Sequence, residues 1–107
     1  MTDFHDREQA FEAKFARDAE LQFRIVARRN RLVGMWAAEQ LKLTPEETDS
    51  YAKSVVQADF EEVGDEDVIR KLLGDLVGGG VDIDEAAVRA ALDNAAVEAR
   101  RQFIEGV

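Results

Sequence analysis

The sequence predicts an all-α protein: a four-helix bundle with an N-terminal extension that is partly disordered or becomes helical on binding a partner. Three observations lead to this class. Only one proline interrupts the 107 residues, and residues with high helix propensity dominate the composition. No alternating run of β-branched residues indicates a strand beyond Ser54, Val55 and Val56. A chain of this length can build one hydrophobic core.

The boundaries of the helices follow from capping residues, glycines and the proline. Thr44 and Glu47 can cap each other across Pro45, so one helix should end near Lys42 and the next should begin at Pro45. Gly64 can close that second helix, and the glycine run 78–80 can end the third. The expected bundle helices are therefore 20–42, 45–62, 66–77 and 84–105.

Apolar residues at helical spacing predict the core. The stripe of the first bundle helix is expected to include Trp36, as a buried structural residue. The three stripes are Leu21, Ile25, Leu32, Val33, Trp36, Ala37, Leu41 and Leu43; Val68, Ile69, Leu72, Leu73, Leu76 and Val77; and Val88, Leu92, Ala95, Ala99 and Phe103.

The segment before residue 20 differs from the rest of the chain. Helical signal continues through it without a break, but its apolar residues are sparse. Phe4, Phe11 and Phe15 are spaced seven and then four, which places them on one helical face. An isolated helix of this length is marginal in water, so we expect residues 1–19 to form a separate unit that folds in a partner's groove, with 20–107 as the bundle. The alternative is that this segment packs on its own bundle as a fifth element.

Charge is strongly negative overall and unevenly distributed. The formal net charge is −9, which makes nucleic acid a poor partner. Four arginines nevertheless cluster at positions 24, 28, 29 and 31, while acidic residues dominate 44–85. The cluster either pairs with these acidic helices within the bundle or forms a docking patch for a partner.

The inventory of chemical groups is poor for an enzyme. The chain has one histidine, His5, and no cysteine, so thiol catalysis and cysteine-ligated zinc are excluded. We expect no catalytic residue and no metal site. The absence of cysteine fits a reducing cytosol, and the N-terminus has no apolar core of a signal peptide. We therefore expect a cytoplasmic protein that does not insert into a membrane.

Several stretches resemble the zeta subunit, the ATPase inhibitor, of alphaproteobacterial F-type ATP synthases. The resemblance is good over residues 3–70 and extends beyond Leu72 only as a helical pattern. The stretches are DREQAFEAKF at 6–15, ARRNRL at 27–32, WAA at 36–38, YAKSVV at 51–56, DFEE at 59–62 and GDEDV at 64–68.

The resemblance implies inhibition of ATP hydrolysis by the catalytic head of the synthase. The N-terminal segment would enter a catalytic α/β subunit interface, reach toward the central rotor stalk and block rotation, while the bundle stays outside. The protein would be associated peripherally with the membrane-bound synthase. The family also suggests adenine-nucleotide binding, although no motif identifies a site.

The partner-binding side chains are then expected in the N-terminal segment, with phenylalanines as anchors and charges that fix the register. These residues are Phe4, Arg7, Glu8, Phe11, Glu12, Lys14, Phe15 and Arg17. Two other interpretations stay open. The chain could be a helical adaptor that binds another partner through the same helix, or a helix–turn–helix regulator that binds DNA through the arginine helix.

Overall fold

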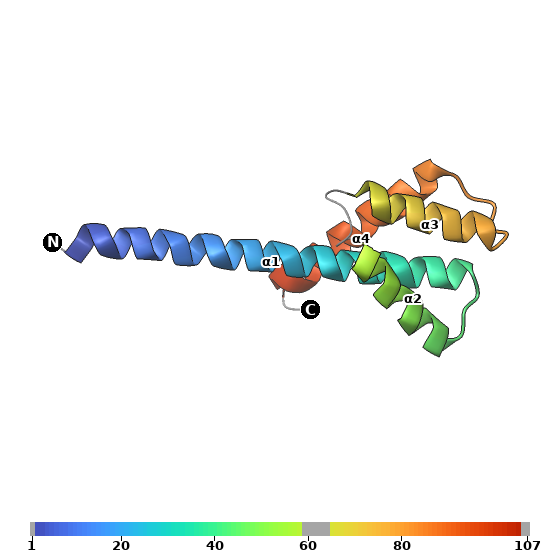
Figure 1. The fold of residues 1–107 in the computed structure, drawn as a ribbon, viewed down its shortest axis with the longest axis horizontal. Helices are drawn as coiled ribbons and strands as arrows, with labels where there is room; N and C mark the ends of the chain where they lie inside the picture. The colour runs from blue at the N-terminus through green and yellow to red at the C-terminus, as the bar shows by residue number, and fades with distance from the viewer. Residues whose placement is uncertain (1, 59–64, 106–107) are drawn as a thin grey trace.

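The described part of the chain folds into four α-helices, as a computed structural model shows (Figure 1). The structure describes the backbone of residues 2–58 and 65–105 and the side chains of 18–58 and 65–104. The helices are α1 (Thr2–Gln40), α2 (Pro45–Ala58), α3 (Glu66–Gly78) and α4 (Glu85–Glu105). No strand occurs among the described residues, so the all-α, four-helix prediction is confirmed.

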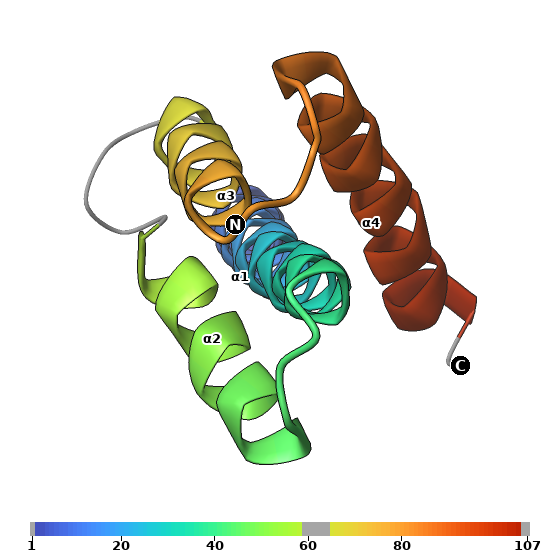
Figure 2. The ribbon, with the colours of Figure 1, turned by 90° about the vertical axis from the view of Figure 1, so that its right-hand side faces the viewer.

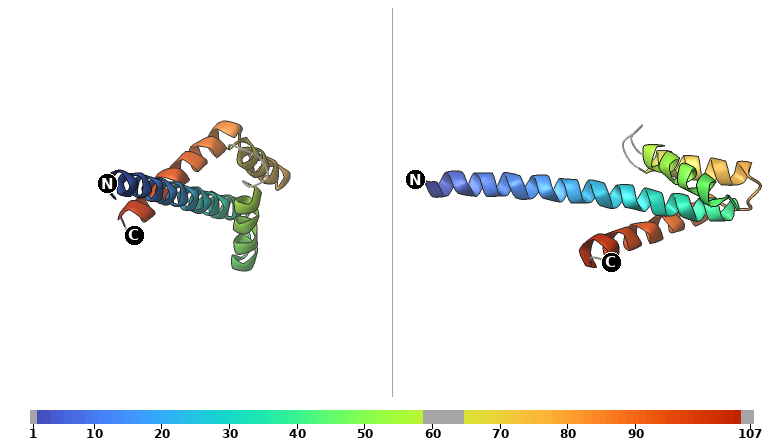
Figure 3. Two further views of the ribbon diagram at one scale, coloured as in Figure 1. Left: turned by 60° about the vertical axis from the view of Figure 1, so that its left-hand side comes forward. Right: turned by 90° about the horizontal axis from the view of Figure 1, so that it is seen from below.

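Helix α1 is a rod of 39 residues around which the other three helices are arranged. At 1.5 Å per residue it is about 58 Å long, and it accounts for most of the 66 Å long dimension of the molecule. Figure 2 shows α2 and α4 on opposite sides of α1, with α3 above it. The N-terminal half of α1 extends away from these three helices (Figures 1 and 3).

The predicted capping box opens α2. Thr44 N–H donates to Glu47 Oε1 at 2.9 Å, and Glu47 N–H donates to Thr44 Oγ1 at 3.2 Å. These bonds satisfy two amides that the first turn of a helix leaves without partners. The hydrogen bond from the Thr44 backbone, and then the one with its side chain, lowers the pKa of Glu47.

Helices α1 and α3 both end in the same hydrogen-bonding motif. Leu43 N–H donates to Ala38 O at 3.1 Å, and Val81 N–H donates to Leu76 O at 2.9 Å. The residue before each donor is left-handed: Lys42 has φ 58° and Gly80 has φ 84°. These are Schellman ends, and they confirm the predicted stops near Lys42 and in the glycine run. The predicted closure of α2 by Gly64, and its last turn through Glu62, lie outside the described residues.

The core lies where the C-terminal part of α1 meets α2, α3 and α4. Most members of the predicted stripes are buried, and nine of them belong to one cluster there. The buried cluster comprises Val33, Ala37, Val55, Val68, Ile69, Leu72, Leu76, Val88, Leu92 and Ala95.

Two stripe residues, Leu21 and Val77, are exposed, and six others are only half-buried: Leu32, Trp36, Leu41, Leu43, Leu73 and Phe103. Leu21 is 40% exposed because it lies on the projecting part of α1, before Ile25, which is the first buried side chain along the described part of the helix. Val77 is 55% exposed in the last turn of α3. Trp36 is half-buried rather than buried, because its indole packs against the edge of the core cluster and not in its centre.

Polar contacts join the shorter helices. Tyr51 Oη donates to Asp75 Oδ2 at 2.7 Å, which ties α2 to α3. Within α3, Lys71 Nζ lies 3.0 Å from the same oxygen. Burial, and then the hydrogen bond to Asp75, raises the pKa of Tyr51. Arg89 Nη2 lies 2.9 Å from Glu66 Oε2 and ties α4 to α3. Both contacts connect neighbouring short helices.

Candidate functional site

The projecting part of α1 carries the whole predicted partner-binding set. Its backbone is helical from Thr2, without interruption, into the bundle. The structure therefore places Phe4, Arg7, Glu8, Phe11, Glu12, Lys14, Phe15 and Arg17 on one helix. Their side chains lie outside the described residues, so their role as contacts stays a prediction.

Exposed side chains continue along α1 from Asp18 up to Arg24. Phe23, in this stretch, is 55% exposed. Arg24 Nη2 pairs with Glu20 Oε1 at 2.7 Å, one turn away on the surface of the same helix. The base of the projecting helix thus offers apolar and charged groups to a partner before Ile25 enters the core.

The arginine cluster divides into members with different tasks. Arg29 is 9% exposed, and its Nη2 lies 2.9 Å from Asp65 Oδ1, at the start of α3. Its Nε donates to Asn30 Oδ1 at 3.0 Å. Arg31 Nη2 lies 3.0 Å from Asp49 Oδ1 of α2. For these two arginines the intramolecular interpretation is confirmed, because both bind carboxylates of other elements.

Arg28 behaves differently from its neighbours. Its guanidinium carbon lies 5.9 Å from the centre of the Phe103 ring, within the range of a cation–π contact. Among the described residues no carboxylate lies within ion-pair distance of Arg28. Arg28 is exposed, so its charge faces solvent over an aromatic ring near the C-terminal end of α4.

A pocket of about 400 Å³ is formed around this contact by α1, α2 and α4. We call it the cationic pocket. Its lining is Phe23, Arg24, Ala27, Arg28, Arg31, Lys53, Val56 and Phe103. Lys53 Nζ lies 3.0 Å from Asp49 Oδ2, and the hydrogen bonds from Lys53 and then Arg31 lower the pKa of Asp49. One aspartate thus partly neutralises two of the cations.

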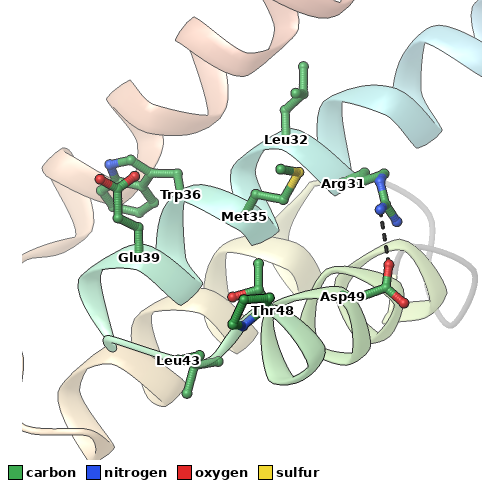
Figure 4. Close-up of a pocket in the computed structure, with 9 residues that line it drawn as sticks. Arg31, Leu32, Met35, Trp36, Glu39, Leu43, Thr48 and Asp49 are labelled. Atoms are coloured by element: carbon green, nitrogen blue, oxygen red, sulfur yellow. Dashed lines mark hydrogen bonds and ion pairs between the residues drawn. The ribbon is translucent and has the colours of Figure 1, made fainter.

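A second groove, of about 780 Å³, lies on α1 beside the first two turns of α2. Figure 4 shows Met35 in its middle, Trp36 and Glu39 at one end, and the Arg31–Asp49 ion pair at the other. A further pocket shares Trp36 and Leu32 and extends toward α4. Trp36 therefore separates two surface grooves, which explains its partial exposure.

Comparison with known proteins gives the family. The family model for ATPase inhibitor subunit zeta matches residues 1–102. The chain belongs to the zeta family. The resemblance inferred from the sequence is therefore confirmed, and the match includes the projecting N-terminal segment. No curated protein matches the sequence significantly.

A solved structure supports the zeta fold. It was determined by solution NMR, is 46% identical in sequence and superimposes with a TM-score of 0.71. The match covers 81% of this zeta-family chain and 99% of the other chain. The four-helix arrangement is thus shared with a protein that was determined experimentally.

Neither a metal-holding group nor a membrane-spanning helix occurs among the described residues of this zeta-family chain. Over residues 18–58 and 65–104, no group of histidine or carboxylate side chains is arranged to hold a metal ion. None of the described helical stretches combines the length and apolar character needed to cross a membrane.

The cationic pocket is the place to test for an adenine nucleotide, which the zeta resemblance suggested. It supplies aromatic rings but only one arginine that has no carboxylate partner among the described side chains. Its walls come from the middle of α1, the second half of α2 and the end of α4, so it lacks the backbone amides of a helix N-terminus that would favour a phosphate. These residues fit a group of low negative charge better than a polyphosphate.

The sequence predicts three of the eight residues that line this pocket, the arginines at positions 24, 28 and 31. The arginine cluster was recognised as a candidate docking patch, but Phe103 was assigned to the core and Lys53 to no site. Phe103 is half-buried and faces Arg28 from a helix at the other end of the chain. Helical periodicity gives the face of a residue but not the element across from it, so the pairing had no signal in the sequence.

Proposed function

We propose that this chain inhibits ATP hydrolysis by the catalytic head of an F-type ATP synthase. Residues 1–19 enter a catalytic α/β subunit interface, reach toward the central rotor stalk and block rotation, and the bundle of residues 20–107 stays outside. The family match over residues 1–102 carries this proposal, because it covers both the segment and the bundle.

The shape of α1 supports such a mechanism. Blocking a rotary motor requires no chemistry, but it requires a stiff element that is held at its outer end. Helix α1 runs from Thr2 to Gln40 without a break, and its C-terminal part is buried among three helices. A load on the inserted end would therefore be carried directly into the bundle. The protein would act without catalysing a reaction, as a peripheral component of the membrane-bound synthase.

The proposed contacts are the aromatic face and its charged rim. Burial of one phenylalanine contributes about 1.5–3 kcal/mol. Phe4, Phe11 and Phe15 are therefore the expected anchors, because a partner's cleft can remove them from water. Arg7, Glu8, Glu12, Lys14 and Arg17 are the expected register-fixing groups at the rim.

Titration of ATP hydrolysis by the matching purified head tests the proposal. The double variant Phe11→Ala/Phe15→Ala should inhibit at least about 100-fold more weakly than the wild type, at about 1.4 kcal/mol per tenfold. The control is Val77→Ala/Val97→Ala, which trims two exposed valines on α3 and α4. That control should keep its potency.

Each result has a distinct meaning. Equal potency of the Phe11→Ala/Phe15→Ala variant would remove the aromatic wedge from the mechanism. Weaker inhibition together with a lower melting temperature would indicate that the segment packs on its own bundle. Absence of inhibition by the wild type would favour the adaptor alternative, in which the same N-terminal helix binds another partner.

A further inference from the structure

The cationic pocket has the properties of a docking site that the inhibitory segment does not use. We propose that it binds an acidic segment of the synthase head, one that carries carboxylates beside an apolar side chain. The bundle would then be held by a second contact, separate from the inserted helix. This inference rests on the proposed function, because it assigns the pocket to the same partner.

The position of the pocket on α1 is the first argument. Its α1 residues, Phe23 to Arg31, begin about one helical turn after the segment that is proposed to enter the interface. With a rise of 1.5 Å per residue, Arg28 lies only about 14 Å along the axis from Ala19. Because the helix is continuous, insertion of residues 1–19 brings the pocket to the partner's outer surface.

Local charge is the second argument. Four cations line the pocket, and among the described side chains only two carboxylates pair with them: Glu20 with Arg24, and Asp49 with both Arg31 and Lys53. The pocket is thus positive on a chain whose net charge is −9. A partner's acidic surface is repelled by most of this protein and attracted here, which fixes the orientation of docking.

The apolar lining selects the kind of acidic ligand. Phe23, Ala27, Val56 and Phe103 form much of the pocket wall beside the arginines. Aromatic residues and arginine together are typical of the energetic centre of protein interfaces. A peptide segment with an apolar side chain between carboxylates uses both features, whereas an inorganic polyphosphate, which has no apolar group, uses only the charge.

Binding of the full-length chain to the purified head, measured without ATP hydrolysis, tests this inference. Biolayer interferometry would compare two variants that lose the same charge. Arg24→Gln/Arg28→Gln removes two cations of the pocket, and Arg70→Gln/Arg89→Gln removes two on α3 and α4 that also form surface ion pairs. The pocket variant should bind at least about tenfold more weakly at low salt, with a smaller difference at high salt. The control should change less than about threefold, because it lies outside the pocket.

The failure of this inference can be told apart from that of the proposed function. If the wild type neither binds nor inhibits the head, the proposed function fails. If it inhibits and the pocket variant binds as tightly as the control, only the docking site is overturned. In the Phe11→Ala/Phe15→Ala background, residual binding to the head should persist and should be lost on adding Arg24→Gln/Arg28→Gln.

A photo-crosslinker placed at position 23 identifies what lies against the pocket. Crosslinking in the complex should map to a peptide of the head that contains aspartate or glutamate. A crosslinked peptide without acidic residues would contradict the proposal. A second result would also contradict it: adenosine triphosphate binds the wild type but not the Arg24→Gln/Arg28→Gln variant, while both bind the head equally tightly. The pocket would then be a phosphate site.

Discussion

The Cα atom of Ala52 lies 2.9 Å from the point where a Cβ atom on Gly34 would stand. Two atoms of the Val55 side chain lie 3.2 and 3.3 Å from the same point. The backbones of α1 and α2 therefore approach each other where a glycine leaves room. Glycine inside a helix costs conformational entropy relative to alanine, so its presence at Gly34 is explained by this crossing rather than by local structure.

The variant Gly34→Ala should be less stable than the wild type. Alanine gains about 1 kcal/mol of helix propensity, but forcing a methyl group into a packed crossing typically costs about 1–3 kcal/mol. Ala52 offers backbone rather than a flexible side chain, so we expect the packing cost to win. Thermal unfolding followed by circular dichroism measures the difference.

Gly74 provides the matched control for this substitution. It lies inside α3 and is exposed, and no atom of a neighbouring element lies within 4 Å of the point where its Cβ atom would stand. Gly74→Ala should therefore show the propensity gain alone and stabilise the protein by about 1 kcal/mol. If both variants were stabilised equally, the close approach at Gly34 would carry no energetic weight.

The left-handed residue at the end of α1 predicts a stabilising substitution. Lys42 has φ 58°, a conformation that costs an L-residue with a side chain roughly 1–2 kcal/mol. Lys42→Gly should remove most of this strain and raise the stability by up to about 1 kcal/mol, after the larger entropy loss of glycine. Gly80→Ala makes the opposite change in the equivalent position of α3, and the melting temperature should fall. A fall for Lys42→Gly would show that the lysine side chain makes a compensating contact.

Much of the fold could be predicted because its signals are local. The Thr44–Glu47 capping box, the stop near Lys42 and the glycine run 78–80 each act through backbone bonds within a few residues. The stripe Val88, Leu92, Ala95 and Ala99 is buried as its spacing indicates.

The features that the sequence did not predict depend on how the helices meet in space. The need for a glycine at position 34 appears only in the structure, where α2 crosses α1 at that residue. The exposure of Leu21 depends on where along α1 the other helices begin to pack. Arg28 and Arg29 are neighbours in sequence, yet one stacks on Phe103 at the surface and the other is buried beside Asp65. No pattern along a single helix distinguishes these outcomes.

The half-buried position of Trp36 predicts a moderate loss of stability on truncation. Complete burial would make Trp36→Ala cost about 3–5 kcal/mol, whereas this indole packs with only part of its surface, so we expect about 2 kcal/mol. Denaturant unfolding measures the free energy. Native tryptophan emission should lie between the values for buried and solvated indoles. Emission typical of full exposure would contradict the packing against the core.

Low pH should reduce the stability of the folded protein, in part because Glu98 becomes protonated. Hydrogen bonds from Arg101 and then Gln102 lower the pKa of this carboxylate from 4.5 to about 2. Because the folded-state pKa is depressed, its contribution to stability is complete above pH 4.5 and is lost as the pH falls toward 2. Melting temperatures measured across this window should fall less steeply for Glu98→Gln than for the wild type.

The control for this pH effect is Glu46→Gln. Glu46 is exposed in the first turn of α2, and no hydrogen bond or ion pair joins it to a described side chain. Glu46→Gln removes a carboxylate without removing such a hydrogen bond, so a difference in slope between the two variants reports the Arg101 and Gln102 contacts of Glu98. An equal slope for Glu98→Gln and Glu46→Gln would show that the Arg101 contact does not persist in solution.

Deletion of residues 1–19 should leave a cooperatively folding bundle. The first buried side chain along the described part of α1 is Ile25, and the buried cluster starts at Val33. Removing the projecting part of the helix therefore takes away no described core contact, and exposed helix ends contribute little to tertiary stability. Ile25→Ala in the full chain is the contrasting variant, because it truncates a core residue at a cost of about 2–5 kcal/mol. A melt that stays sharp after the deletion and shifts downward with Ile25→Ala is the expected pair of results. If the deletion abolished the cooperative transition, residues 1–19 would belong to the folded core and could not act as a separate inhibitory segment.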